Sequence, residues 1–186
     1  MNEDLVSVIM PAFNSERYIV ESIESILNQT YRNIELLITD DGSEDNTISI
    51  IKSYAQKDSR VKAFFLKGNT GAGSARNNSI KHAKGRYIAF CDSDDVWLPE
   101  KLEKQIRFMQ EKNCCFAFAS YYVFDSESRK KGIVLAPSSV SLIDTKRDDK
   151  IGFLTAVYDT SFYGKFYMPT LRKRQDWAYV LQILQK

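Results

Sequence analysis

The stretch Tyr87-Ile88-Ala89-Phe90-Cys91-Asp92-Ser93-Asp94-Asp95-Val96-Trp97-Leu98-Pro99 joins five mostly apolar residues directly to three carboxylates within four positions. An uninterrupted apolar run of this kind is typical of a strand that is buried on both faces. The acidic residues would then lie at the carboxyl end of the strand, where open α/β sheets bind their ligands. The stretch therefore predicts an α/β fold with a ligand site directly after this strand.

The three acidic side chains are close enough to repel one another. Asp92, Asp94 and Asp95 cannot all be ionised and buried without a compensating cation. Mg²⁺ is typically held by one or two carboxylates together with the phosphates of a substrate, so the cluster favours a metal–phosphate site. The alternative is a solvated acidic turn, in which Asp95 caps the next helix and Pro99 fits its start.

Length and composition limit the class of protein. The chain has 186 residues, of which 44% are hydrophobic and 27% charged, which predicts one globular domain. A net charge of +2 gives no electrostatic case for a nucleic-acid partner. The cysteines Cys91, Cys114 and Cys115 lie in apolar surroundings without metal-ligand spacing, which indicates reduced residues of a cytosolic protein.

Targeting signals are not expected from the sequence. The start of the chain is acidic and leads into a short apolar run, so we expect no signal peptide. No apolar stretch approaches the roughly 20 residues that a membrane span needs. Any membrane association is therefore expected to be peripheral.

Short apolar runs alternate with helical patterns through the first two thirds of the chain. Strands are expected over 5–10, 34–39, 61–66, 87–91 and 114–124, and helices over 15–27, 46–57, 74–83, the stretch after Pro99, and 175–186. This alternation predicts a mostly parallel sheet with right-handed crossovers. Residues 126–132 are expected to form a polar turn and 137–150 a long loop.

Two further motifs follow predicted strands. Asp40-Asp41 can accept hydrogen bonds from a base or ribose, although an Asx turn is the alternative reading of Asp-Gly. The loop Gly71-Ala72-Gly73-Ser74-Ala75-Arg76 only superficially matches a dinucleotide fingerprint, because Arg76 stands in place of the third glycine. We interpret it as a loop that allows close backbone approach, with Arg76 directed toward a diphosphate; a turn with a surface arginine is the alternative.

Two other features carry less information. His82, the only histidine, has no candidate Ser or Cys partner, which makes a structural role the better interpretation. The basic run Arg172-Lys173-Arg174 is either a solvated face or a surface that attracts a phosphorylated or lipid-linked acceptor at a membrane.

In this order, the motifs resemble family 2 of the inverting glycosyltransferases, the GT-A-type enzymes that use nucleotide sugars. The resemblance is carried by residues 6–14, 40–43, 69–77, 92–95 and 173–177. It covers the chain from Leu5 to about Val123 and again from Gly164 to Leu184. It implies a Rossmann-like, three-layer α/β/α sandwich around a central, mostly parallel sheet.

The same resemblance assigns roles to individual residues. The nucleotide sugar, expected to be UDP-linked, would be bound by Pro11, Ala12, Phe13, Asn14, Asp41, Arg76, Asp92 and Ser93. Among these, Asp41 would hold the uracil ring. Asp94 would ligate Mg²⁺ or Mn²⁺ on the diphosphate, and Asp176 would be the general base. Gln175 stands where many family members have Glu.

The resemblance also implies a biological setting. The enzyme would transfer a hexosyl or N-acetylhexosaminyl group to a saccharide or lipid-linked acceptor in bacterial cell-surface polysaccharide, capsule or lipopolysaccharide synthesis. It would act in the cytoplasm, at the inner face of the plasma membrane. Residues 1–186 would form one domain, with a donor half over 1–124 and an acceptor half over 125–186 that is incomplete at its C-terminus.

Other classes of protein remain open at this point. A fragment that binds nucleotide sugar and metal without transferring sugar would share the same motifs. A sugar nucleotidyltransferase should carry a glycine-rich basic loop after the first strand, where this chain has Pro11-Ala12-Phe13-Asn14. A phospho-acceptor receiver domain should have its acidic pair after strand one and a lysine after the last strand, and neither is present.

Overall fold

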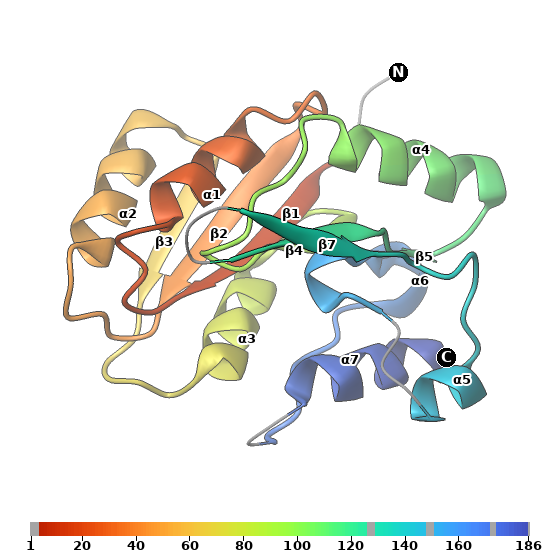
Figure 1. The fold of residues 1–186 in the computed structure, drawn as a ribbon. Coiled ribbons are helices and arrows are strands. Elements are labelled where there is room, and N and C mark those ends of the chain that lie inside the picture. Colours follow the sequence, from red (N-terminus) through yellow and green to blue (C-terminus); the bar gives the residue numbers. More distant parts are fainter. Residues whose placement is uncertain (1–3, 126–128, 148–150, 172–173, 186) are drawn as a thin grey trace.

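A six-stranded sheet forms the centre of the computed structural model, which describes residues 4–125, 129–147, 151–171 and 174–185 (Figure 1). The order of its strands is β3-β2-β1-β4-β8-β5. The first four strands are parallel, and β8 pairs antiparallel with both β4 and β5. The strands of this sheet are β1 Val6–Ala12, β2 Ile34–Asp40, β3 Val61–Phe65, β4 Tyr87–Phe90, β5 Phe116–Ala117 and β8 Val157–Asp159.

Helices cover both faces of the sheet. The helices are α1 Ile19–Leu27, α2 Thr47–Lys57, α3 Ala72–His82, α4 Lys101–Lys112, α5 Leu142–Arg147, α6 Thr160–Tyr163, α7 Gln175–Leu184 and the 3₁₀ turn η1 Phe153–Thr155. One hydrophobic core joins the sheet to α1, α2 and α4, and a second joins it to α3, η1 and α7. The predicted three-layer α/β/α sandwich with a mostly parallel sheet is therefore confirmed.

The first strand runs further than predicted. It continues through Pro11 and Ala12, which were expected in the following loop. The Ile9 carbonyl accepts from Cys91 on the β4 side, and the Ala12 carbonyl accepts from Asp41 on the β2 side. Pro11 therefore faces the β4 side, beyond the last β1–β4 pair, where its missing N–H removes no ladder hydrogen bond.

The single strand predicted over 114–124 is wrong. The structure divides it into β5, in the main sheet, and β6 Tyr121–Phe124, which forms a separate hairpin with β7 Lys130–Val134. The chain leaves the main sheet between them, where the Ala119 N–H donates to the Thr155 hydroxyl at 3.0 Å instead of to a neighbouring strand. The polar turn expected over 126–132 partly becomes β7, and residues 126–128 lie outside the described ranges.

The long loop expected over 137–150 contains a helix, α5. Ser141 and Asp144 form a reciprocal cap at its start, because the Ser141 hydroxyl accepts from the Asp144 N–H at 3.2 Å and the Asp144 carboxylate accepts from the Ser141 N–H at 3.3 Å. Trp177 of α7 donates its indole N–H to the Thr145 carbonyl at 2.7 Å. This bond ties α5 to the helix that carries the predicted base.

Candidate active site

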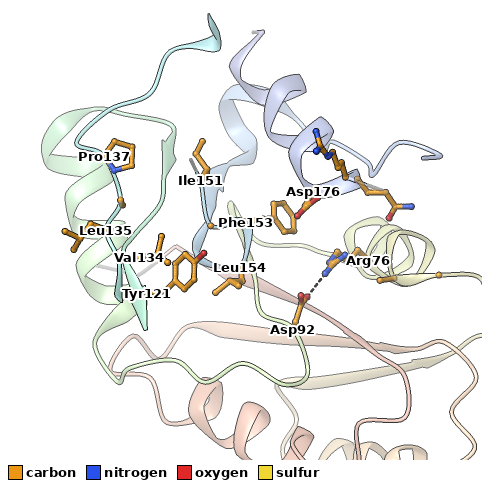
Figure 2. Close-up of a pocket in the computed structure, with 16 residues that line it drawn as sticks. Arg76, Asp92, Tyr121, Val134, Leu135, Pro137, Ile151, Phe153, Leu154 and Asp176 are labelled. Atoms are coloured by element: carbon orange, nitrogen blue, oxygen red, sulfur yellow. Dashed lines mark hydrogen bonds and ion pairs between the residues drawn. The ribbon is translucent and has the colours of Figure 1, made fainter. Parts of the chain in front are cut away.

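A cavity of about 910 Å³ lies between α3, the β6–β7 hairpin, η1 and the start of α7. Three residues of the predicted site, Arg76, Asp92 and Asp176, line it together (Figure 2). The opposite wall is apolar and consists of Tyr121, Val134, Leu135, Pro137, Ile151 and Leu154. The fold therefore brings the end of β4, the start of α3 and the start of α7 to one polar surface that faces a hydrophobic wall.

Arg76 and Asp92 form an ion pair at the floor of the cavity, with Arg76 Nη2 2.5 Å from Asp92 Oδ1. The arginine side chain is only 11% exposed, and its guanidinium lies 5.6 Å from the Phe153 ring centroid. Its Nε is buried without a hydrogen-bond partner among the described residues. Burial and the aromatic contact hold the guanidinium in place, while part of its hydrogen-bonding capacity remains unused.

The three carboxylates of the acidic loop, residues 92–95, have different surroundings. Asp92 pairs with Arg76, Asp94 is exposed to solvent, and Asp95 is half-buried. Burial, and then the neighbouring charges of Asp92 and Asp94, raises the pKa of Asp95 to about 7. The loop thus carries a negative potential that a cation would relieve.

A metal bound by protein side chains alone does not fit this loop. Within the described residues, no group of three His, Cys, Asp or Glu side chains is arranged to hold a metal ion. The exposed Asp94 carboxylate and the negative potential around Asp95 do fit a cation that takes its remaining ligands from a diphosphate and water.

Ser93 fixes the position of the acidic loop. It is buried, and its hydroxyl lies 2.7 Å from that of Ser15. Its carbonyl accepts from the Ser22 hydroxyl of α1 at 2.9 Å. The structure therefore gives Ser93 a positioning contact, and its predicted contact with the donor stays a prediction.

The two carboxylates after β2 are both engaged by the chain itself. Asp40 accepts from the N–H groups of Gly42 and Ser43, the Asx-turn arrangement. Asp41 is buried and accepts from the Thr70 N–H at 3.0 Å, the Thr70 hydroxyl at 2.7 Å and the Gly71 N–H at 2.6 Å. Asp41 therefore holds the loop that opens α3, and its role in reading uracil stays a prediction.

The other predicted donor residues lie where β1 ends. Pro11 and Ala12 are buried at the end of the strand, and Phe13 and Asn14 are exposed. Asn14 has a left-handed φ of 48°, and its backbone N–H donates to the Ser43 hydroxyl at 2.8 Å. This contact joins the loops after β1 and β2. None of these four residues lines the 910 Å³ cavity, nor do Asp41, Ser93 and Asp94.

The side chain of Gln175, at the start of α7, lies against Gly73 at the start of α3. A Cβ atom on Gly73 would collide with the side-chain amide of Gln175, so the glycine leaves room for that amide against α3. Arg174 precedes α7 with a left-handed φ of 58°, and Asp176 lies in the first turn of the helix. A carboxylate in the first turn of a helix interacts favourably with the positive end of the helix dipole.

Sequence reasoning missed the aromatic and apolar part of the site. Phe153 stacks beneath Arg76 and lies 4.3 Å from Phe90 and 5.7 Å from Tyr179, measured between ring centroids. The Tyr121 ring packs against Gly152, where an added Cβ would collide with it. The density of aromatic residues between 153 and 179 was the available signal, but it does not show which of them face a cavity.

Comparison with known proteins agrees with the predicted family and with the observed fold. The model of the family described as "Glycosyl transferase family 2" matches residues 7–172. A putative teichuronic acid biosynthesis glycosyltransferase, TuaG of Bacillus subtilis, is 40% identical over 183 residues, which is 98% of this chain and 73% of the relative. The Escherichia coli protein WfgD, named as a UDP-Glc:alpha-D-GlcNAc-diphosphoundecaprenol beta-1,3-glucosyltransferase, is 40% identical over 185 residues, which is 100% of this chain and 72% of the relative.

Among solved structures, residues 1–349 of S. aureus TarS in complex with UDP superpose with a TM-score of 0.78 at 26% identity. The match covers 96% of this chain and 54% of that one, so the chain spans about half the length of this structural relative. The chain belongs to glycosyl transferase family 2 and has the GT-A fold. Its homologues include enzymes of bacterial polysaccharide synthesis.

None of the helices in the described ranges combines the length and the hydrophobicity that a membrane crossing requires.

Proposed function

We propose that this glycosyltransferase moves a hexosyl or N-acetylhexosaminyl group from a UDP-linked donor to an acceptor hydroxyl, with inversion at the anomeric carbon. The observation that carries the proposal is the convergence of Arg76, Asp92 and Asp176 on one cavity. The first two follow the donor-side strands, and the third comes from the opposite, acceptor-side helix. A donor and an acceptor bound between them would meet inside that cavity.

The donor is inferred to bind along the carboxyl edge of β1, β2 and β4. UDP as the nucleotide is supported by the TarS complex with UDP and by the name of the E. coli relative. Mg²⁺ or Mn²⁺ would be held at Asp94, with Asp95 adding negative potential. When bound, the metal would offset the charge that develops on the departing diphosphate.

The residues of the chain account for the remaining chemistry. Asp176 would accept the proton of the acceptor hydroxyl as the new glycosidic bond forms. Attack from the Asp176 side, opposite the departing diphosphate, inverts the configuration at the anomeric carbon. The apolar wall around Tyr121 and Leu154 would exclude water, which otherwise competes with the acceptor.

The acceptor is inferred to be a saccharide or a lipid-linked saccharide, used at the inner face of the bacterial plasma membrane in the synthesis of a cell-surface polysaccharide. The named acceptor of the E. coli relative, a diphosphoundecaprenol-linked sugar, supports the lipid-linked form. Residues 1–124 would bind the donor, and residues 125–186 would contribute the acceptor side.

A thermal-shift panel of UDP, GDP and ADP with and without Mn²⁺ tests the proposal. A nucleotide at 100 times its Kd adds about 2.7 kcal/mol of stability, which in a chain of this size raises Tm by about 5–10 °C. We expect the largest shift for UDP with Mn²⁺. A larger shift with GDP or ADP would contradict the proposed donor, and no shift with any nucleotide would contradict the proposed site.

A further inference from the structure

We propose that the β6–β7 hairpin is the surface by which this protein docks on an anionic lipid bilayer, so that the cavity lies next to the membrane. The proposal deepens the proposed function in one respect, because a lipid-linked acceptor would then reach Asp176 from the bilayer. The docking itself depends only on the hairpin.

The hairpin exposes several large apolar side chains to solvent. Within the described residues, β6 and β7 pair only with each other. Tyr122, Phe124 and Ile133 are 43%, 55% and 50% exposed. A two-stranded hairpin is marginally stable by itself in water, and adjoining exposed apolar side chains mark an interaction surface.

The two faces of the hairpin have different surroundings. Tyr121 and Val134 are direct partners across the strands, and both line the cavity. Tyr122 and Ile133 are the next pair, so their side chains project from the opposite face. We call this opposite face the outer face. The inner face, with Tyr121 and Val134, forms part of the cavity's apolar wall (Figure 2).

Positive charge accompanies the exposed apolar side chains. The cations Arg129, Lys130 and Lys131 follow one another along the hairpin, and Asp125 pairs with the first and the third of them. Lys130 places its ammonium 3.7 Å from the centroid of the Tyr122 ring. With Glu127 counted as well as Asp125, three cations stand against two anions, so residues 125–131 carry a net charge of +1.

This combination fits a bilayer surface better than it fits a second protein. Aromatic rings with lysines beside them are the groups that occupy the level of lipid headgroups. Basic residues next to the membrane are attracted by anionic lipids and leave that surface as salt rises. Because the inner face of the same hairpin lines the cavity, docking would present the apolar wall, and with it Leu135, to the hydrocarbon part of an acceptor.

Vesicle flotation of the whole chain tests the proposal. The probes are vesicles of phosphatidylglycerol and phosphatidylcholine in equal parts, and vesicles of phosphatidylcholine alone. One variant combines Tyr122→Ser, Phe124→Ser and Ile133→Ser, and a second combines Lys130→Gln and Lys131→Gln. The matched control is Phe108→Ser on α4, because Phe108 is 47% exposed and lies outside the hairpin.

We expect the unaltered chain to float with the anionic vesicles and not to bind the vesicles of phosphatidylcholine alone. The apolar variant should bind the anionic vesicles at least about tenfold more weakly than the unaltered chain. The charge variant should bind them about tenfold more weakly. Phe108→Ser should bind them as well as the unaltered chain does. UDP affinity by calorimetry should stay the same in all of them, because none of the substituted side chains lines the cavity or the donor edge.

Three results would overturn the proposal. The first is an unaltered chain that does not bind anionic vesicles, and the second is hairpin variants that bind them as well as it does. The third is a dimer that both hairpin variants convert to monomers, because a second copy of the chain would then cover the outer face. Failure to bind UDP would instead contradict the proposed function and leave the vesicle result standing.

Discussion

Lys101 at the start of α4 is expected to reduce the stability of the fold, although it lies next to the acidic loop. Its ammonium is buried 3.8 Å from the Trp97 ring centroid and has no hydrogen-bond partner among the described residues. Burial lowers the pKa of Lys101 to about 7. A cation in the first turn of a helix is also opposed by the helix dipole.

The cost follows from the difference between the pKa values of the unfolded and folded states. A pKa of 10.5 unfolded and about 7 folded corresponds to about 5 kcal/mol where both states are protonated. We therefore expect Lys101→Met, which keeps the length of the side chain, to raise the free energy of unfolding by up to about 5 kcal/mol at pH 6.

The difference between the two pKa values also predicts how the free energy of unfolding changes with pH. Between about pH 7 and 10.5 the unfolded chain binds a proton at Lys101 that the folded chain does not, so the unaltered chain gains stability as the pH rises. The advantage of Lys101→Met should accordingly be full at pH 6 and shrink toward pH 10. Urea unfolding of both chains at pH 6, 8 and 10 measures it.

Lys104→Met is the matched control on the same helix. Lys104 is exposed and pairs with Glu100 at 2.6 Å, so its replacement should change stability by no more than about 0.5 kcal/mol at any of these pH values. The reasoning is refuted if Lys101→Met is no more stable than the unaltered chain at pH 6, or if its advantage is the same at pH 6 and pH 10.

Three further substitutions test the site. Asp94→Ala should abolish the dependence of UDP affinity on Mn²⁺ without lowering Tm, since it relieves repulsion in the acidic loop; unchanged Mn²⁺ dependence in calorimetry contradicts the metal assignment. Asp41→Ala leaves the buried donors of the 69–71 loop unpaired and should cost about 1–3 kcal/mol of stability. It should also weaken UDP more than GDP, and equal weakening would leave Asp41 with the loop role alone. Gly73→Val should displace the Gln175 side chain and slow sugar transfer while UDP affinity is kept; an unchanged rate would show that the position of this side chain does not matter.

The first four strands and the helices between them could be predicted from the sequence. Their apolar periodicity is strong, and each strand ends in residues that cannot continue a buried run, such as the acidic loop after Phe90. Parallel strands present their carboxyl ends at one edge of the sheet, so the sequence also predicts that Arg76 and Asp92 lie near each other. Their direct ion pair could not be predicted, because a residue pattern does not show whether an arginine pairs with a phosphate or with a carboxylate.

The region after residue 114 could be predicted less well. The apolar run 114–124 is continuous in sequence, and only the distant Thr155 shows where the chain leaves the main sheet. The cap that starts α5 is two polar residues in a polar segment, which also fits a loop. The apolar wall of the cavity could not be predicted, since Tyr121 and Tyr122 are equivalent in sequence and only the pairing of β6 with β7 separates the inner from the outer face.

The rate of sugar transfer by Asp176→Asn tests the central claim most directly. Asn keeps the shape of the side chain and caps a helix as well as Asp does, but it cannot take a proton. If Asp176 is the base at this cavity, transfer should fall by roughly 10²–10⁴-fold, while the affinity for UDP and Mn²⁺ stays that of the unaltered chain. Transfer at the unaltered rate would contradict the account and leave Asp176 as a residue of the first turn of α7.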